Sequence, residues 1–178
     1  MSLQEIYQNT IKFAAHKHAE INQTIPGTNL PYVVHLSNVA MEILVASEQS
    51  ESFNTGFAIQ VALLHDVLED TDATFEELSE KFGKAVAEGV LALTKNAELP
   101  KYERMAESLK RIRQQPQEVW AVKVADRITN LQQPPHFWTP EKIEKYIQEA
   151  TMILKELRGG NTYLEHRLQN KIENYNAD

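Results

Sequence analysis

The sequence predicts an all-α protein, a bundle of about eight to ten helices that forms a single domain over residues 1–178. Apolar residues recur at steps of three and four along most of the chain, which is the spacing of one face of a helix. Prolines and glycines separate these periodic stretches and stand where helices would begin or end. A chain of 178 residues, 42% of them hydrophobic, is long enough to bury one stable core.

Residues 1–93 contain five predicted helices. The first begins after Ser2 and Glu5, whose spacing is that of a capping box, and runs to about His18. The pattern breaks over residues 21–30, around Pro26, which predicts a loop. The other four helices predicted in this half cover residues 31–46, 56–68, 74–83 and 86–93.

The remaining residues predict four more helices. Segment 119–124 is rich in valine and could form a strand, but Ala125, Ile128 and Leu131 continue a helical stripe. No other segment offers a strand to pair with it, so a helix is predicted there. Residues 132–139 are expected to form a loop whose aromatic cluster, from His136 to Trp138, either covers a site or packs on the protein. The four predicted helices begin at Pro100, Pro116, Pro140 and Asn161.

The composition excludes several classes of protein. There is no cysteine, so disulfides, thiolate metal sites and cysteine nucleophiles are impossible, and a reducing cytoplasmic location is expected. No run of 18 apolar residues is present, and the first ten residues do not resemble an export signal, so no membrane association is expected. The net charge of -7 opposes binding of nucleic acid but permits a small anionic ligand beside a metal ion or local basic residues. The sequence assigns no protein partner.

The dipeptide His65-Asp66 is the first candidate metal-binding feature. It lies near the end of the most apolar predicted helix, where an ionised carboxylate is costly unless a positive group faces it. Adjacent helical residues point about 100° apart, so both could bind one ion only in a groove between helices. His35 and Asp126 are polar residues within the apolar runs VVHLSNVA and VKVADRITN and are candidates for the other ligands. Two imidazoles and two carboxylates would balance a divalent ion, with Mn²⁺, Fe²⁺ or Zn²⁺ favoured over Mg²⁺.

Three further polar residues lie close to these candidates along the chain. Glu69 and Asp70 follow the His-Asp pair by about one helical turn, so their side chains could lie over the open side of an ion and act as acid and base. Asn130 follows Asp126 by four residues and shares its helix face, where its amide could bind a ligand or orient the carboxylate.

Four segments, in this order, resemble the HD-domain phosphohydrolases: PYVVHLSNVA, ALLHDVLEDTDATFEEL, TKNAELPKYER and VKVADRITNL. The similarity spans about residues 5 to 155 and is strongest to the small alarmone hydrolases and the hydrolase half of bifunctional Rel/Spo-type enzymes. The resemblance implies an all-α bundle of the HD-domain type with one Mn²⁺ ion. It implies that the ion is bound by His35, His65, Asp66 and Asp126.

The resemblance also implies an activity: a guanosine 3′,5′-bis(diphosphate) 3′-pyrophosphohydrolase that releases pyrophosphate from a small nucleotide substrate. In such an enzyme Glu69 and Asp70 serve the attacking water and Asn130 contacts the nucleotide. Lys101 and Tyr146 fall where relatives place a phosphate-contacting lysine and a sugar-side tyrosine. Each of the three substrate contacts could instead have a purely structural role. Asn130 could be a helix-packing amide, Lys101 a solvated residue in a first helical turn, and Tyr146 a side chain of the core.

One departure from the family leaves the substrate open. Relatives have a glycine-glutamine-arginine-lysine type stretch after the first helix, whereas this chain has no lysine or arginine between His18 and His35. An HD phosphatase acting on another nucleotide, an adenine alarmone or NADPH, is therefore the alternative enzyme. A non-catalytic nucleotide sensor is the alternative from another class, and the presence of Glu69 and Asp70 argues against it.

Overall fold

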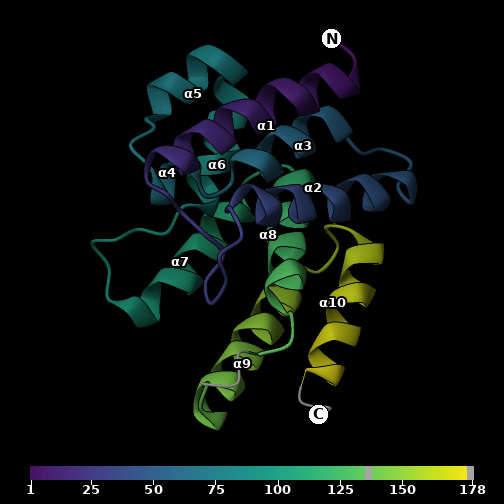
Figure 1. Cartoon of the computed structure of the whole chain (residues 1–178). Coiled ribbons are helices and arrows are strands. Elements are labelled where there is room, and N and C mark those ends of the chain that lie inside the picture. The colour runs from purple at the N-terminus through teal and green to yellow at the C-terminus, as the bar shows by residue number, and fades with distance from the viewer. Residues whose placement is uncertain (135–137, 176–178) are drawn as a thin grey trace.

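Ten α-helices are present in the computed structural model, which describes residues 1–134 and 138–175 (Figure 1). Within these ranges the only β structure is a single antiparallel bridge between Thr24 and Pro31, so the predicted all-α class is confirmed. His136 and Phe137 of the predicted aromatic loop lie outside the described residues. The helices are α1 (Leu3–Glu20), α2 (Val33–Glu48), α3 (Thr55–Leu64), α4 (Val67–Asp70), α5 (Phe75–Phe82), α6 (Lys84–Leu93), α7 (Lys101–Ile112), α8 (Gln117–Asn130), α9 (Pro140–Glu156) and α10 (Thr162–Asn174).

Polar side chains at the starts of helices explain several of these boundaries. The Ser2 hydroxyl accepts a hydrogen bond from the Glu5 amide while the Glu5 carboxylate accepts one from the Ser2 amide, which is the predicted capping box. Each such cap satisfies an amide that has no partner within its helix. The other helix starts capped by a side chain are at Asn54, Thr74, Thr139 and Asn161.

Two predicted boundaries differ from the structure. The second helix begins at Val33 rather than at Pro31, because Pro31 pairs with Thr24 and the Tyr32 amide donates to the Gln23 carbonyl. The predicted helix 56–68 is divided into α3 and α4 by a turn at residues 65–66. In this turn the imidazole Nδ1 of His65 lies 2.7 Å from the carbonyl oxygen of Ala62 and satisfies an acceptor in the last turn of α3.

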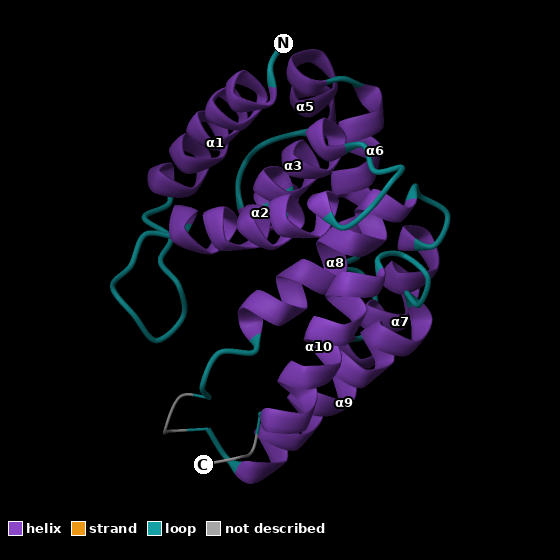
Figure 2. Ribbon diagram, turned by 90° about the vertical axis from the view of Figure 1, so that its right-hand side faces the viewer, coloured by secondary structure: helices purple, strands orange, loops and turns teal. Residues whose placement is uncertain are grey.

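Helices α3 and α8 form the centre of the bundle. Helix α3 is apolar almost all round and packs against α1, α2, α6 and α8, while α8 also packs against α9 and α10. The chain termini lie at opposite ends of the molecule, with α9 and α10 at the C-terminal end (Figure 2). None of the helices in the described ranges has the length and hydropathy that crossing a bilayer requires.

Gly89 allows α6 to lie close to this centre. A Cβ atom at this position would lie 3.2 Å from a methyl carbon of Val61 in α3 and 3.2 Å from a methyl carbon of Val119 in α8. Both valines are fully buried, so neither has free space to move into. The small residue therefore sets the distance between three helices that carry or support the polar centre described below.

We expect Gly89→Leu to lower the free energy of unfolding by about 1–3 kcal/mol, because the larger side chain overpacks a filled core. Urea denaturation followed by circular dichroism measures the change. Lys84→Leu on the same helix is the matched control, since the Lys84 side chain is 78% exposed and surface substitutions change stability by about 0.5 kcal/mol or less. Equal stability of the Gly89→Leu and Lys84→Leu proteins would contradict the packing argument.

Candidate metal centre

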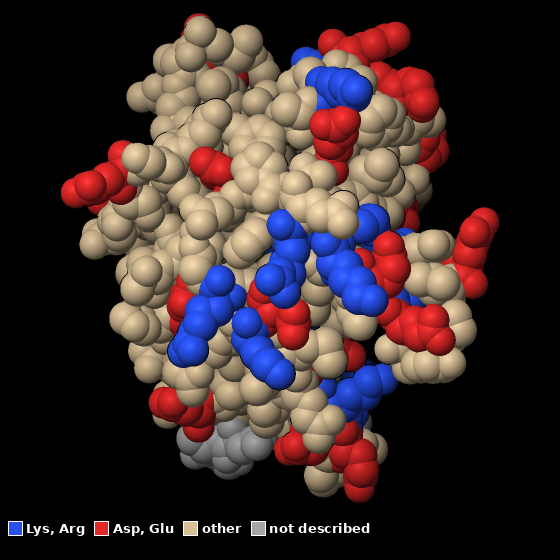
Figure 3. Space-filling view, turned by 180° about the vertical axis from the view of Figure 1, so that it is seen from behind, with Lys and Arg blue, Asp and Glu red and all other residues tan. Residues whose placement is uncertain are grey.

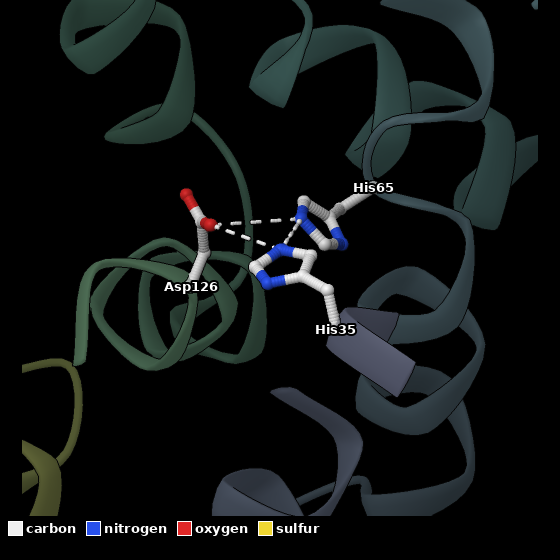
Figure 4. A group of neighbouring side chains, drawn as sticks. All are labelled: His35, His65 and Asp126. Carbon is white, nitrogen blue, oxygen red and sulfur yellow. Dashed lines mark hydrogen bonds and ion pairs between the residues drawn. The ribbon is translucent and has the colours of Figure 1, made fainter. Parts of the chain in front are cut away.

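Three buried side chains from separate parts of the bundle converge on one point (Figure 4). His35 lies in the first turn of α2, His65 in the turn after α3, and Asp126 near the end of α8. The Nε2 atoms of the two imidazoles are 3.4 Å apart and lie 3.5 Å and 3.7 Å from Oδ1 of Asp126. Their exposed fractions are 5%, 3% and 7%, so the surrounding helices hold these groups away from bulk water.

Asp66 lies beside this group. Its Oδ2 atom is 3.0 Å from Nε2 of His65 and 4.0 Å from Nε2 of His35, and it accepts a hydrogen bond from the Tyr32 hydroxyl. Burial alone would raise the pKa of Asp66, but His65 and the Tyr32 hydroxyl outweigh burial and hold it well below its usual range. The turn between α3 and α4 thus carries both residues of the His-Asp pair and places their side chains in contact.

The protonation of His65 follows from its contacts. Its Nδ1 atom can only donate to the Ala62 carbonyl, so Nε2 is the atom that is free to face the other ligands. Burial lowers the pKa of the His65 imidazole, but the carboxylates of Asp66 and Asp126 outweigh burial and raise it to about 10. At neutral pH the metal-free protein therefore carries a proton on Nε2 that any metal ion must displace.

Two residues of α8 orient the carboxylate of Asp126. The Lys123 ammonium donates to Oδ2 at 3.0 Å and the Asn130 amide donates to Oδ1 at 2.5 Å. Burial would raise the pKa of Asp126, yet Lys123 and the two imidazoles hold it well below its usual range. Lys123 is itself only 7% exposed, so this ion pair is shielded from solvent.

These residues fit a divalent metal ion. Ligand atoms that share an ion at bond lengths of about 2.1 Å lie about 3.0–3.4 Å apart in octahedral or tetrahedral geometry. The Nε2 and carboxylate oxygen separations here are 3.0–4.0 Å. His35, His65 and Asp126 therefore form a group that can hold one ion. Asp66, the fourth predicted ligand, lies beside this group and is not part of it, with its Oδ2 atom 3.0 Å from Nε2 of His65.

The predicted acid and base lie in the same place as these ligands. Glu69 and Asp70 line a cavity of about 170 Å³ together with His65, Asp66 and Asp126. Tyr32, Lys95, Lys123 and Asn130 also line this cavity.

Glu69 is held by the segment that follows α6. One of its carboxylate oxygens accepts from the backbone amide of Lys95 at 3.0 Å, and the other accepts from the Lys95 ammonium at 2.8 Å. Arg111 of α7 fixes that segment, since its guanidinium donates to the carbonyls of Leu91 and Thr94. Hydrogen bonds from α7 thus support the segment whose Lys95 holds Glu69.

The carboxylate of Asp70 is held by a different segment of the chain. Its Oδ2 atom accepts a hydrogen bond of 2.8 Å from the side-chain amide of Gln23, in the loop between α1 and α2. Burial and the neighbouring carboxylates of Asp66 and Glu69 raise the pKa of Asp70 above its usual value, although the Gln23 hydrogen bond opposes this shift. Asp70 and Glu69 are adjacent in sequence but have different partners.

Two predicted substrate contacts do not line the cavity. Lys101 is exposed at the first residue of α7, and Tyr146 of α9 packs over the Arg127 guanidinium at 4.4 Å from its ring centroid. Burial raises the pKa of Tyr146 to about 12. Asn130, the third predicted contact, does line the cavity.

Three residues of the site were not predicted from the sequence: Lys123, Tyr32 and Gln23. Lys123 precedes Asp126 by three residues, and this helical spacing could have identified it. Tyr32 likewise precedes His35 by three residues, next to the start of α2. Gln23 carries no such signal, because its contact with Asp70 depends on the path of the loop.

A larger cavity of about 860 Å³ lies between the segment after α8, the start of α9 and α10. Its lining includes His166, Arg167 and Lys171 but no aspartate or glutamate among the described residues. Arg167 is paired with Glu42, with two nitrogen–oxygen distances of 2.6 Å. This cavity therefore lacks the carboxylates that metal-assisted hydrolysis requires.

Comparison with known proteins points to one family. A sequence model of the HD domain family matches residues 10–160 of this chain. Two proteins named guanosine-3′,5′-bis(diphosphate) 3′-pyrophosphohydrolase MESH1, from Danio rerio and Homo sapiens, are 37% and 33% identical to it. The first alignment covers 90% of this chain and 88% of the relative, and the second covers 88% and 87%.

Solved structures agree with the sequence matches. A structure described as a metazoan ortholog of SpoT that hydrolyzes ppGpp and plays a role in starvation responses has a TM-score of 0.80 and 30% identity to this chain. The match covers 96% of both chains. Protein lmo0812 from Listeria monocytogenes EGD-e has the same fold, with a TM-score of 0.65 and 24% identity over 83% of this chain and 99% of its own.

The raised pKa of His65 makes a prediction about metal binding. Between pH 6 and 8 the affinity for a divalent ion should rise by up to about tenfold per pH unit, because the ion must displace the His65 proton. Isothermal titration calorimetry in buffers of different ionisation enthalpy measures both the affinity and the protons released. His16→Asn is the control, since the His16 side chain is 75% exposed and outside the site. An affinity that does not change with pH would contradict the assigned protonation.

Proposed function

The chain belongs to the HD-domain family, and from this premise we propose that it is a metal-dependent nucleotide phosphohydrolase. It cleaves guanosine-3′,5′-bis(diphosphate) at the 3′ position and releases pyrophosphate. One observation carries this proposal: His35, His65 and Asp126 converge on a possible ion position, and two of them, His65 and Asp126, line the same cavity as Glu69 and Asp70. The similarity to MESH1 proteins supports the choice of substrate.

We propose that Asp66 completes the ligand set and that the ion is Mn²⁺. The mixed nitrogen and oxygen donors support a transition ion over Mg²⁺, and the cysteine-free sequence leaves no thiolate to favour a softer metal. When bound, a divalent ion supplies Lewis acidity, which lowers the pKa of water and withdraws electrons from a phosphoryl oxygen. The hydrogen bond from Tyr32 fixes one oxygen of Asp66, as groups beyond the ligands commonly do at metal sites.

Glu69 and Asp70 divide the proton transfers. The reaction joins a water oxygen to the phosphorus next to the 3′ oxygen and breaks the bond between that phosphorus and the 3′ oxygen. Both oxygens of Glu69 accept hydrogen bonds from Lys95, which suits a carboxylate that takes a proton from water. Burial raises the pKa of Asp70, which suits a group that gives a proton to the leaving oxygen.

The phosphates lie beside the two lysines of the cavity, which are paired with Glu69 and Asp126. The net charge is -7, and on the face in Figure 3 the Lys and Arg side chains across the middle lie among Asp and Glu side chains. At about 170 Å³ the cavity is smaller than pockets that enclose whole ligands, about 300–1,000 Å³. It takes the diphosphate, beside Lys95, Lys123 and Asn130, and the rest of the nucleotide lies over its mouth. Lys101 and Tyr146 remain proposed contacts for that outer part.

One observation favours a different nucleotide as the second candidate. The loop between α1 and α2 has no lysine or arginine, and two of its polar side chains, Gln23 and Tyr32, are already bonded to site carboxylates. A nucleotide whose base or phosphates do not depend on basic side chains of this loop, an adenine alarmone or NADPH, would then be bound instead. A nucleotide sensor that does not hydrolyse its ligand would not need the acid and base that Glu69 and Asp70 supply in the cavity.

We also propose that residues 1–178 form one domain and that the protein works in the cytoplasm. The family match over residues 10–160 supports a single domain, since few residues remain outside it. The absence of cysteine supports a reducing compartment. The nucleotide is the proposed partner, and the acidic net charge argues against nucleic acid and anionic membranes.

A substrate panel tests the proposed function. With Mn²⁺, the protein should release pyrophosphate from guanosine-3′,5′-bis(diphosphate), and chelation of the metal should abolish release. A coupled assay detects pyrophosphate from guanine or adenine alarmones, and a malachite-green assay detects phosphate from NADPH. Turnover of an adenine alarmone or of NADPH alone would select the second candidate, whereas no release from any nucleotide would favour a sensor.

We expect Glu69→Gln to lower kcat by about 10²–10⁴-fold, because the amide cannot accept the proton of the attacking water. Metal content, measured by atomic absorption, should stay at the wild-type level, since the Glu69 carboxylate is bonded to Lys95 and not to the ligand imidazoles. Glu98→Gln makes the same change of charge at an exposed position and is the control. Near wild-type kcat in the Glu69→Gln protein would remove Glu69 from the mechanism.

A further inference from the structure

The side chain of Gln23 connects a buried histidine to Asp70. Its Oε1 atom is 2.6 Å from Nδ1 of His18, near the end of α1, and its Nε2 atom donates to Oδ2 of Asp70 at 2.8 Å. The three residues come from α1, from the loop that follows it and from α4. This chain of hydrogen bonds lies outside the ligand set and approaches the cavity from the α1 side.

The chemistry of the groups fixes the direction of these bonds. Oδ2 of Asp70 accepts both in the ionised carboxylate and in the carboxyl group that carries its proton on Oδ1, so Gln23 must present its NH₂ group to Asp70 and its oxygen to His18. Nδ1 of His18 must then carry the proton and donate it to Gln23. Burial lowers the pKa of His18, which is 2% exposed, so the neutral ring with its proton on Nδ1 is the state present at neutral pH.

The backbone also holds Gln23 in place. Its amide donates to the His18 carbonyl at 3.0 Å, and its carbonyl accepts from the Tyr32 amide at 3.1 Å. The ring of Tyr32 packs on that of His18 with centroids 4.8 Å apart, and the Tyr32 hydroxyl donates to Asp66. Both ends of the loop, at Gln23 and at Tyr32, are thus held next to the site. The Gln23 side chain therefore loses little further conformational entropy when it bonds to Asp70.

We propose that Gln23 is a positioning residue, which holds Oδ2 of Asp70 so that the other carboxyl oxygen faces the cavity. The proposal rests on the proposed function, because it gives Asp70 the role of proton donor. Without this bond, Asp66 and Glu69 repel the Asp70 carboxylate and favour its turning outward into water. His18 acts through Gln23, since its Nδ1 proton keeps the Gln23 amide from rotating.

Kinetics of two Gln23 variants test this role. Gln23→Met keeps the length of the side chain but removes both hydrogen bonds, and Gln23→Glu keeps its shape but places a carboxylate against Asp70. Both should lower kcat by about 10–100-fold through misplacement of Asp70, with KM and metal affinity changed by less than about threefold. Wild-type kcat in Gln23→Met would overturn the proposal.

A double-mutant cycle separates positioning from simple support of the loop. In the Asp70→Asn background, Gln23→Met should lower kcat by less than about twofold, because the group that Gln23 positions is already gone. A structural role predicts the same loss in both backgrounds and would overturn the proposal. Thr28→Val is the matched control, because Thr28 also braces this loop, through the Ile25 carbonyl and the Leu30 amide, yet does not contact Asp70. It should leave kcat unchanged.

A crystal structure of the Gln23→Met protein decides the geometry without any assay of turnover. We expect the Asp70 carboxylate to leave the position it occupies beside the cavity. If it keeps that position, Gln23 does not position it and the proposal fails. If the wild-type protein hydrolyses no nucleotide, the proposed function fails instead, and this structural comparison still decides whether Gln23 holds Asp70.

Discussion

The burial of ionised groups at the centre of an apolar bundle is the constraint on which the rest of the structure depends. Asp126 and the two imidazoles are almost fully shielded from water, which costs several kcal/mol for a charge without compensation. Lys123, Asn130 and the imidazoles supply that compensation only at short range. Helices α2, α3 and α8 must therefore keep fixed distances, and the close packing around Gly89 serves the site as well as stability.

The turn after α3 places four of the polar residues at the cavity. It brings His65 and Asp66 to the same point and starts α4, which carries Glu69 and Asp70 to the cavity. Those two acids are then held by unrelated segments, one by Lys95 and the other by Gln23. Different partners therefore hold the two adjacent carboxylates, so each can be moved by substitution without changing the contacts of the other.

The sequence predicts most of this arrangement because its signals are local. Helical periodicity and polar caps place the helices, and His35 and Asp126 are recognisable as polar residues in apolar runs. The division of helix 56–68 was not predictable, since the apolar pattern continues through it. The contact of Gln23 with Asp70 was not predictable either, because it depends on a loop path that no periodicity encodes.

The charges of the cavity imply an order of binding. Four acidic side chains line it, Asp66, Glu69, Asp70 and Asp126, against two lysines and the protonated imidazole of His65, which leaves one negative charge when all four acids are ionised. Both lysines are already paired with carboxylates, so neither offers an anion an uncompensated charge. A diphosphate entering the metal-free cavity would meet net repulsion at low effective dielectric. A divalent ion cancels the excess, so the nucleotide gains affinity only after the metal is bound, and the metal centre controls both binding and chemistry.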